Sequence, residues 1–211
     1  MKKYFTLFLI VIIGYTGSAQ TAKLISDCSV VYQISVQDAN ANPQLIKAME
    51  GATKTVYLRG TKTRSDLTTS GFLQTTLQDS KSDTTIILRE LGNNKYISYL
   101  NDKKKKEQYK KFDGIQFSNT TEKKTILGYQ CIKTVAKLTD GSSFNIYYTD
   151  AIVPSNKQFE YQFKDLPGFV LEYEALSEDN KYKVKYTASK ISLIPIPIAK
   201  FDIPTSGYRV L

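Results

Sequence analysis

Alternation of apolar and polar residues is the feature that most limits what this chain can fold into. From Cys28 to Val36 apolar residues occupy every second position, with Val31 as an additional apolar residue. A period of two is typical of a strand with one buried and one exposed face. Similar runs follow, separated by short turns rich in glycine and polar residues. The strands expected in this way cover residues 28–36, 53–59, 62–69, 72–79, 84–90, 95–100, 131–139, 143–149, 169–174 and 181–188.

The segments between these runs carry turn and helix signals. Asp140-Gly141 lies between two alternating runs and predicts a tight hairpin. Asn42 can cap a helix, Pro43 suits its first position and Gly51 can end it. This short helix is expected to pack on the sheet through the face that contains Leu45, Ile46 and Met49. The C-terminal prolines, which cannot donate to a ladder, favour an edge or irregular segment at Pro195, Pro197 and Pro204.

The N-terminus resembles a cleavable export signal. Lys2 and Lys3 precede an apolar stretch of about ten residues, and Gly17-Ser18-Ala19 is a small-residue cleavage site. The stretch is shorter than the roughly 20 residues needed to span a bilayer. We therefore expect residues 1–19 to be a signal peptide and residues 20–211 to form a single exported domain, periplasmic or fully extracellular.

About 190 residues with nine to eleven short strands and few helices predict a mainly β protein. One large antiparallel sheet that curls, or a sandwich of two sheets, satisfies the pattern equally well. Periodicity alone leaves both open.

Two cysteines, Cys28 and Cys131, remain after export to an oxidising compartment. A disulfide between them would close a loop of about a hundred residues and stabilise the fold by up to roughly 4 to 5 kcal/mol. We expect this bridge, and two buried free thiols are the alternative. No Cys-x-x-Cys pair supports redox catalysis.

The chain contains no histidine, which excludes the Ser-His-Asp and Cys-His catalytic arrangements and the usual zinc sites. We accordingly expect no enzyme, no metal and no cofactor. A carboxylate-based hydrolase is the remaining enzymatic alternative. Glu172 and Glu174 lie on one strand face, but no third acid is known to lie near them.

The net charge of +9 includes a dense run of lysines. In an exported protein this charge indicates an anionic lipid, lipopolysaccharide or simple solubility, and not nucleic acid. The alternative is a solvated turn or an exposed helix between strands. The candidate anion-facing residues are Lys103, Lys104, Lys105, Lys106, Lys110 and Lys111.

Aromatic residues are abundant, with 15 tyrosines, 10 phenylalanines and no tryptophan. They line a cavity for an apolar ligand or form ordinary core and cross-strand pairs. The aromatic candidates for ligand binding are Tyr96, Tyr147, Phe169 and Tyr173.

Four short motifs give the chain a family resemblance. They are Gly60-Thr61-Lys62-Thr63-Arg64, Gly128-Tyr129-Gln130-Cys131, Leu166-Pro167-Gly168-Phe169-Val170-Leu171-Glu172, and Phe201-Asp202-Ile203-Pro204 with Gly207-Tyr208. In order and spacing they resemble the GLPGLI-type exported proteins and the related LolA-like proteins of Gram-negative envelopes. The resemblance implies a strongly curved antiparallel sheet, an incomplete barrel with a few short helices over its concave side. In LolA that hollow receives lipoprotein acyl chains, and the resemblance makes Arg64 a candidate at the hollow.

These observations lead to two functional hypotheses. The first is a non-enzymatic periplasmic binding protein that holds a lipid or other apolar ligand in the concave face of a half-barrel, with lipid, lipidated protein or an anionic membrane as partner. The alternative is an envelope structural or protein-interaction module whose core is filled by its own side chains.

Overall fold

The computed structural model describes residues 21–38, 41–82, 84–176 and 182–211. The predicted signal peptide, residues 1–19, lies outside the described residues. Within them, no helix combines the length and apolar character needed to cross a bilayer.

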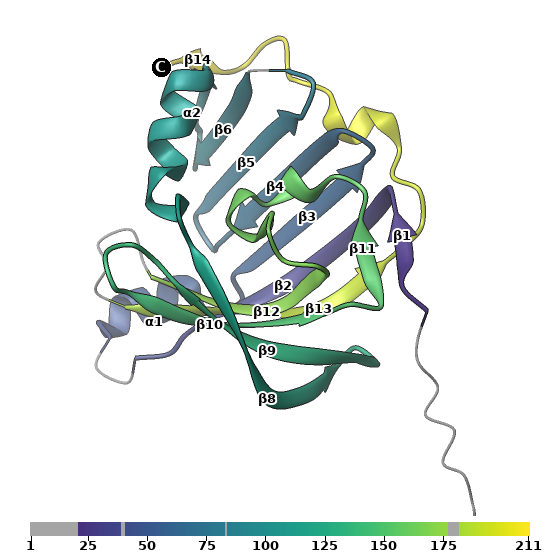
Figure 1. Ribbon diagram of the computed structural model, residues 1–211. Helices are drawn as coiled ribbons and strands as arrows, with labels where there is room; N and C mark the ends of the chain where they lie inside the picture. The colour runs from purple at the N-terminus through teal and green to yellow at the C-terminus, as the bar shows by residue number, and fades with distance from the viewer. Residues whose placement is uncertain (1–20, 39–40, 83, 177–181) are drawn as a thin grey trace, which may run out of the picture.

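One large sheet dominates the molecule. Its 12 strands run in the order β14-β7-β6-β5-β4-β3-β2-β13-β12-β10-β9-β8, and neighbours are antiparallel except for the parallel pair β14 and β7. The sheet bends strongly without closing, so that β3 to β7 form one wall while β2, β13, β12, β10, β9 and β8 curve beneath it (Figure 1). The predicted mainly β, strongly curved incomplete barrel is therefore confirmed, and a two-sheet sandwich is excluded.

The strands of the large sheet are β2 (Asp27–Val36), β3 (Thr53–Arg59), β4 (Lys62–Thr68), β5 (Phe72–Asp79), β6 (Thr85–Leu91), β7 (Asn94–Leu100), β8 (Gln116–Ile126), β9 (Tyr129–Lys137), β10 (Ser143–Thr149), β12 (Phe169–Leu176), β13 (Lys183–Ser192) and β14 (Arg209–Val210). A separate parallel pair joins β1 (Lys23–Ile25) and β11 (Ile152–Pro154). The helices are α1 (Pro43–Met49), α2 (Asp102–Tyr109) and the 3-10 turns η1 (Lys110–Phe112), η2 (Lys157–Phe159), η3 (Tyr161–Phe163) and η4 (Ile198–Phe201).

The alternating runs located the strands well. Those expected at 53–59, 72–79 and 143–149 coincide with β3, β5 and β10. The longest strand, β8, was missed because it is an edge strand whose residues are mostly exposed, so it lacks an apolar face. The predicted hairpin at Asp140-Gly141 joins β9 to β10, where Leu138 N donates to Ser142 O at 2.9 Å.

The short helix α1 begins where it was predicted, because Asn42 Oδ1 accepts from Gln44 N at 2.8 Å. The expected packing on the sheet is largely wrong. None of its residues is buried and Ile46 is 46% exposed, while Met49 alone reaches the small cluster around Ile34.

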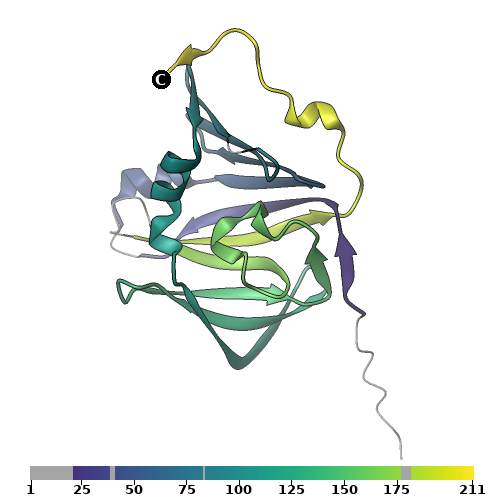
Figure 2. The ribbon, with the colours of Figure 1, turned by 45° about the horizontal axis from the view of Figure 1, so that its top comes forward.

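The two faces of the wall have different coverings. Strand alternation places Thr76 and Gln78 on the concave face and Leu77 on the opposite face. There the C-terminal segment packs Phe201 and Tyr208 on a small apolar cluster of Leu77, Leu88 and Ile97. The view of Figure 2 shows this segment and the segment between β11 and β12 on opposite sides of β3 to β6. The C-terminal prolines thus belong to an irregular cover that ends in the edge strand β14, as predicted.

Two glycines in the family-like motifs have direct structural causes. Leu127 and Gly128 adopt positive φ values of 51° and 81° in the turn between β8 and β9, a conformation that glycine tolerates best. Gly168 lies where the chain enters β12, and a Cβ there would stand 2.0 Å from the carbonyl oxygen of Thr149. The glycine of the Leu-Pro-Gly motif therefore lets the start of β12 contact the backbone at the end of β10.

Replacing Gly168 by alanine should lower the free energy of unfolding by roughly 3 kcal/mol, because backbone atoms have to move to admit the methyl group. Urea unfolding followed by circular dichroism measures the change. Gly71→Ala is the matched control, since no atom lies within 4 Å of its would-be Cβ and its φ is not positive. Equal effects of the two substitutions would contradict this explanation.

Candidate functional site

The concave side of the sheet is covered by residues 155–168, which connect β11 to β12 and include η2 and η3 (Figures 1 and 2). Asn156 starts this covering segment: its Oδ1 accepts from Gln158 N at 3.1 Å and its Nδ2 donates to Thr61 O at 3.3 Å. Phe159, Phe163 and Leu166 are then buried in the main core. The covering segment therefore brings its own apolar side chains into the bend of the sheet.

Aromatic rings fill the middle of the concave side. Phe159 stacks on Phe169 with ring centroids 5.3 Å apart, and Phe163 meets Tyr173 edge to face at 5.0 Å. Tyr173 also stacks on Tyr186 at 4.5 Å. Such contacts stabilise by roughly 1 kcal/mol each beyond area burial.

An ion pair lies at the centre of this interior. Lys54, on the concave face of β3, donates from Nζ to Glu160 Oε1 of the covering segment and to Tyr173 Oη, the latter at 2.9 Å. The side chains are 15% and 6% exposed. Burial alone would lower the pKa of Lys54, but the charge and hydrogen bond of Glu160 raise it above its ordinary value. Lys54 is thus held as an ammonium and links the sheet to its cover.

The tyrosines around the pair are held neutral. Burial, assisted by the charge of Glu160, raises the pKa of Tyr32 and Tyr173 well above the ordinary value. Tyr32 Oη donates to Val170 O at 2.7 Å. These phenols act as fixed hydrogen-bonding groups at neutral pH.

A polar cavity of about 110 Å³ opens beside the ion pair, between the β3 to β5 wall and the covering segment. Within the described residues, Glu160 Oε2 is buried without a hydrogen-bond partner. The walls of this polar cavity are Lys54, Val56, Thr63, Ser65, Thr76, Gln78, Tyr109, Phe159, Glu160, Tyr161 and Gln162.

An apolar cavity of about 150 Å³ lies on the other side of η3, toward the ends of β9, β10 and β12. Aromatic and aliphatic side chains supply most of its surface. Its walls are Lys111, Phe112, Leu138, Asp140, Ser142, Phe144, Gln162, Phe163, Tyr173, Glu174, Ala175 and Leu176. Gln162 lines both cavities, so η3 is the partition between them.

Two of the predicted ligand-binding aromatics, Phe169 and Tyr173, lie in this interior, and Tyr173 lines the apolar cavity. Arg64 does not: its neighbours Thr63 and Ser65 line the polar cavity, so Arg64 points to the opposite face. It pairs there with Asp66 at 2.8 Å and donates to Lys200 O at 2.9 Å, which anchors the C-terminal cover.

Tyr147 is buried in the main core but lines neither cavity, and Tyr96 also lies outside both. Tyr147 donates to Glu122 and has Lys124 Nζ 3.8 Å from its ring centroid. Tyr96 is on β7, next to the sheet edge, opposite Arg209 of β14. Sequence alternation identified aromatic strands but did not distinguish these positions from the interior ones.

The predicted disulfide is absent, since Cys28 and Cys131 are both buried free thiols. They belong to β2 and β9, and three strands lie between these in the sheet. Four interstrand steps of about 4.8 Å separate the strands, whereas a disulfide requires Cα atoms within roughly 7 Å. Burial raises the pKa of Cys28 to about 12 and that of Cys131 to about 11, so both remain protonated.

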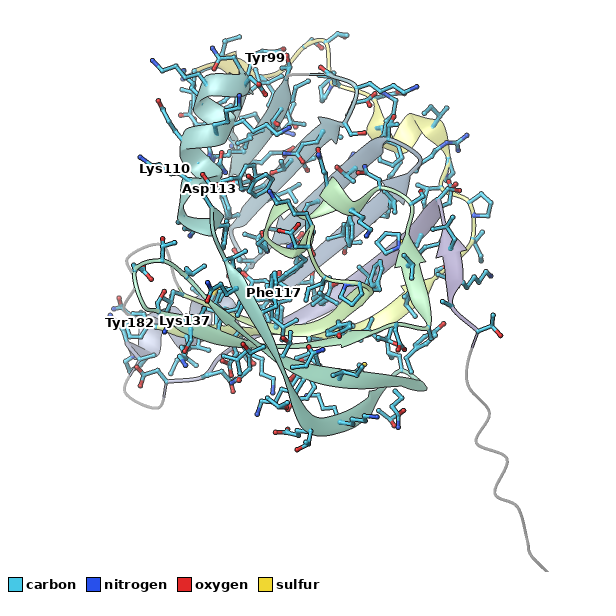
Figure 3. All side chains as sticks on the ribbon, viewed as in Figure 1. Tyr99, Lys110, Asp113, Phe117, Lys137 and Tyr182 are labelled. Carbon is cyan, nitrogen blue, oxygen red and sulfur yellow. The ribbon has the colours of Figure 1, made fainter. Side chains whose placement is uncertain are left out.

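The lysine run forms α2 and η1, which agrees with the exposed helix considered as its alternative interpretation. Lys103, Lys104, Lys106, Lys110 and Lys111 are exposed and Lys105 is half-buried. Figure 3 shows Lys110 pointing outward. At the end of α2, Tyr109 stacks on Tyr161 at 4.9 Å and accepts from Gln78 Nε2 at 3.2 Å. The lysine helix is therefore fixed to the wall of the polar cavity.

Sequence reasoning missed the central pair. Lys54 carried a usable signal, because it shares the face of Val56 and Leu58 and is the only charged residue at the alternate positions of that strand. Glu160 carried none, since it lies between short 3-10 turns with no periodic pattern.

Comparison with known proteins yields structural likeness only. No family model matches the chain, and no curated protein matches it. A conserved protein from Thermus thermophilus is 10% identical, with a TM-score of 0.51 over 88% of this chain and 90% of that one. This likeness supports the fold. The GLPGLI-type assignment remains a prediction.

Two other solved structures align more weakly. The structure of PNGF-II is 14% identical, with a TM-score of 0.46 over 88% of this chain, which spans about 31% of that protein's length. An outer membrane lipoprotein-sorting protein domain from Vibrio parahaemolyticus is 7% identical, with a TM-score of 0.21 over 84% of this chain and 89% of that one.

Removing one member of the Lys54–Glu160 pair should lower the free energy of unfolding more than removing both members. Glu160→Gln leaves the Lys54 ammonium buried without its counter-ion and should lower the free energy of unfolding by roughly 3 kcal/mol. The double variant K54M/E160M should recover most of that loss, because the residues fill similar volume without charge. Urea unfolding of all three proteins measures this. A double variant no more stable than the single one would contradict the assignment.

Stability should also fall at alkaline pH. Because the folded pKa of Lys54 is raised, the unfolded chain loses its proton first, so the contribution of the pair is complete below about pH 10 and is lost as pH rises through the folded value. Urea midpoints between about pH 8 and 11, which bracket the ordinary lysine pKa, test this. The stability of the K54M/E160M variant should decline less steeply with rising pH. If both proteins lost stability equally with pH, the ion pair would not be the source of the decline.

Proposed function

We propose that the protein is a non-enzymatic, exported binding protein that holds an apolar group of its ligand in the apolar cavity beside Phe163. The observation that supports this is the cavity itself, which is lined mostly by aromatic and aliphatic side chains beside the ring-filled middle of the concave side. Protein cores pack at the density of organic crystals, and unfilled apolar space is unfavourable. A ligand that fills the space recovers those contacts.

The size of the cavity limits what it accepts. Apolar cavities of about 150 Å³ bind molecules such as benzene, and sites that enclose a drug-sized ligand measure roughly 300 to 1,000 Å³. The apolar cavity therefore suits a ring or one end of a hydrocarbon chain. A longer chain has to extend into solvent or displace the covering segment.

The exposed lysines of α2 and η1 fit a ligand taken from an anionic membrane. Each lysine near such a surface contributes about 1 kcal/mol of attraction. Lys111 lines the apolar cavity and belongs to the same lysine run. This arrangement would place the cavity mouth close to the head groups.

The second candidate is an envelope interaction module without a small ligand. It is favoured by the rings of Phe159, Phe163, Phe169 and Tyr173, which occupy the middle of the bend. A lipidated protein or another envelope protein would then bind an outer surface.

Ala175 offers a direct test, because its side chain lines the apolar cavity. Ala175→Phe should fill the space and reduce binding of a fluorescent short-chain fatty acid at least tenfold, as measured by fluorescence titration. Ala48→Phe, on the exposed side of α1, is the matched control and should bind as the wild type does. If wild-type protein takes up no such probe, and delipidated protein retains no lipid by mass spectrometry, the interaction module becomes the better proposal.

A further inference from the structure

We infer that the polar cavity at Lys54 and Glu160 binds a neutral, hydroxyl-bearing head group of the glycerol type, and that the ligand is an amphiphile whose chain enters the apolar cavity. This inference rests on the proposed function, because it names the class of molecule that would occupy the same interior.

The first support is the unsatisfied oxygen of Glu160. Its side chain is 6% exposed, and Oε2 has no hydrogen-bond partner within the described residues although Oε1 accepts from Lys54. A buried carboxylate oxygen without a donor is unfavourable, because it has lost its hydrogen bonds to water without replacing them. Because Glu160 lines the cavity, a group placed there with an O–H or N–H would lie beside this carboxylate as a hydrogen-bond donor.

The charge of the walls selects a neutral group. Lys54 and Glu160 are the two formally charged residues that line the polar cavity, and they neutralise each other. A phosphate would meet the Glu160 carboxylate, and a quaternary ammonium has no proton to donate to it. A hydroxyl both donates and accepts, so it matches Glu160 as well as the hydroxyls of Thr63, Ser65 and Thr76.

The cavity is sized for a small head group. About 110 Å³ holds a group of a few heavy atoms and not an oligosaccharide. Tyr109 and Tyr161, stacked on each other, close one side of this space.

The position of the two cavities points to one ligand. Gln162 lines both, and Tyr173, which lines the apolar cavity, accepts a hydrogen bond from Lys54 at 2.9 Å. A molecule that crosses η3 at Gln162 would place its polar end at Glu160 and its apolar end at Phe163. A monoacylglycerol has this composition: a vicinal diol joined to a hydrocarbon chain without net charge.

Calorimetric titration of the full chain tests the inference with three probes: monooctanoylglycerol, methyl octanoate and glycerol. The first two share the acyl chain and differ in the diol. We expect wild-type protein to bind monooctanoylglycerol at least tenfold more tightly than methyl octanoate, since hydrogen bonds to charged groups have effects of about that size. In K54M/E160M, which keeps the cavity volume, the preference should fall below twofold.

The conservative variant Ser65→Ala provides a second measurement if the double variant unfolds. It removes one hydroxyl from the polar cavity and should weaken only the diol probe, by about three- to tenfold. Equal wild-type affinity for both acylated probes would overturn the inference while leaving the proposed function intact. Binding of neither acylated probe would refute the proposed function, and tight binding of glycerol without any gain from the chain would leave a polyol site and refute the amphiphile.

Discussion

The contact between Lys54 and Glu160 determines how the concave side of this protein is closed. A strongly bent sheet exposes an apolar inner face, and burying that face requires a covering element. Here the cover is a short irregular segment with little regular secondary structure. One ion pair in the middle, surrounded by tyrosines, connects that segment to β3. On one side of η3 the remaining space is polar, and on the other side it is apolar.

A buried ion pair at this position is not by itself evidence of added stability. Removing two charges from water offsets much of their mutual attraction, so an apolar pair of similar size would hold the segment nearly as firmly. The pair instead leaves one oxygen, Glu160 Oε2, buried without a hydrogen-bond partner within the described residues, on a side chain that lines the polar cavity. Retaining an unsatisfied group beside a cavity is easier to understand if a ligand completes its hydrogen bonds.

Much of the fold follows from the sequence because the sheet is two-faced. Residues such as Tyr32, Ile34 and Val36 alternate with polar neighbours, and this pattern locates β2 without further information. The strongly polar β8 escaped prediction because an exposed edge strand need not alternate. The curvature came from the family resemblance, since local periodicity carries no information on how far a sheet bends. The disulfide failed for the same reason: strand order, which places β13, β12 and β10 between the cysteines, is not visible in local patterns.

The site was predicted less well than the fold. Phe169 and Tyr173 are interior, but Arg64 and Tyr147 point to the other face, and Glu160 had no sequence signal.

Native-state hydrogen exchange of the Phe163 and Leu166 amides, which donate to Glu160 O and Phe163 O at 2.9 and 3.0 Å, tests the role of the central pair most directly. If Lys54 and Glu160 anchor the covering segment, these amides exchange as slowly as those of β2 and β3 in the wild type and much faster in Glu160→Gln. If the Phe163 and Leu166 amides exchanged rapidly in the wild type while the amides of β2 and β3 stayed protected, the account would be contradicted.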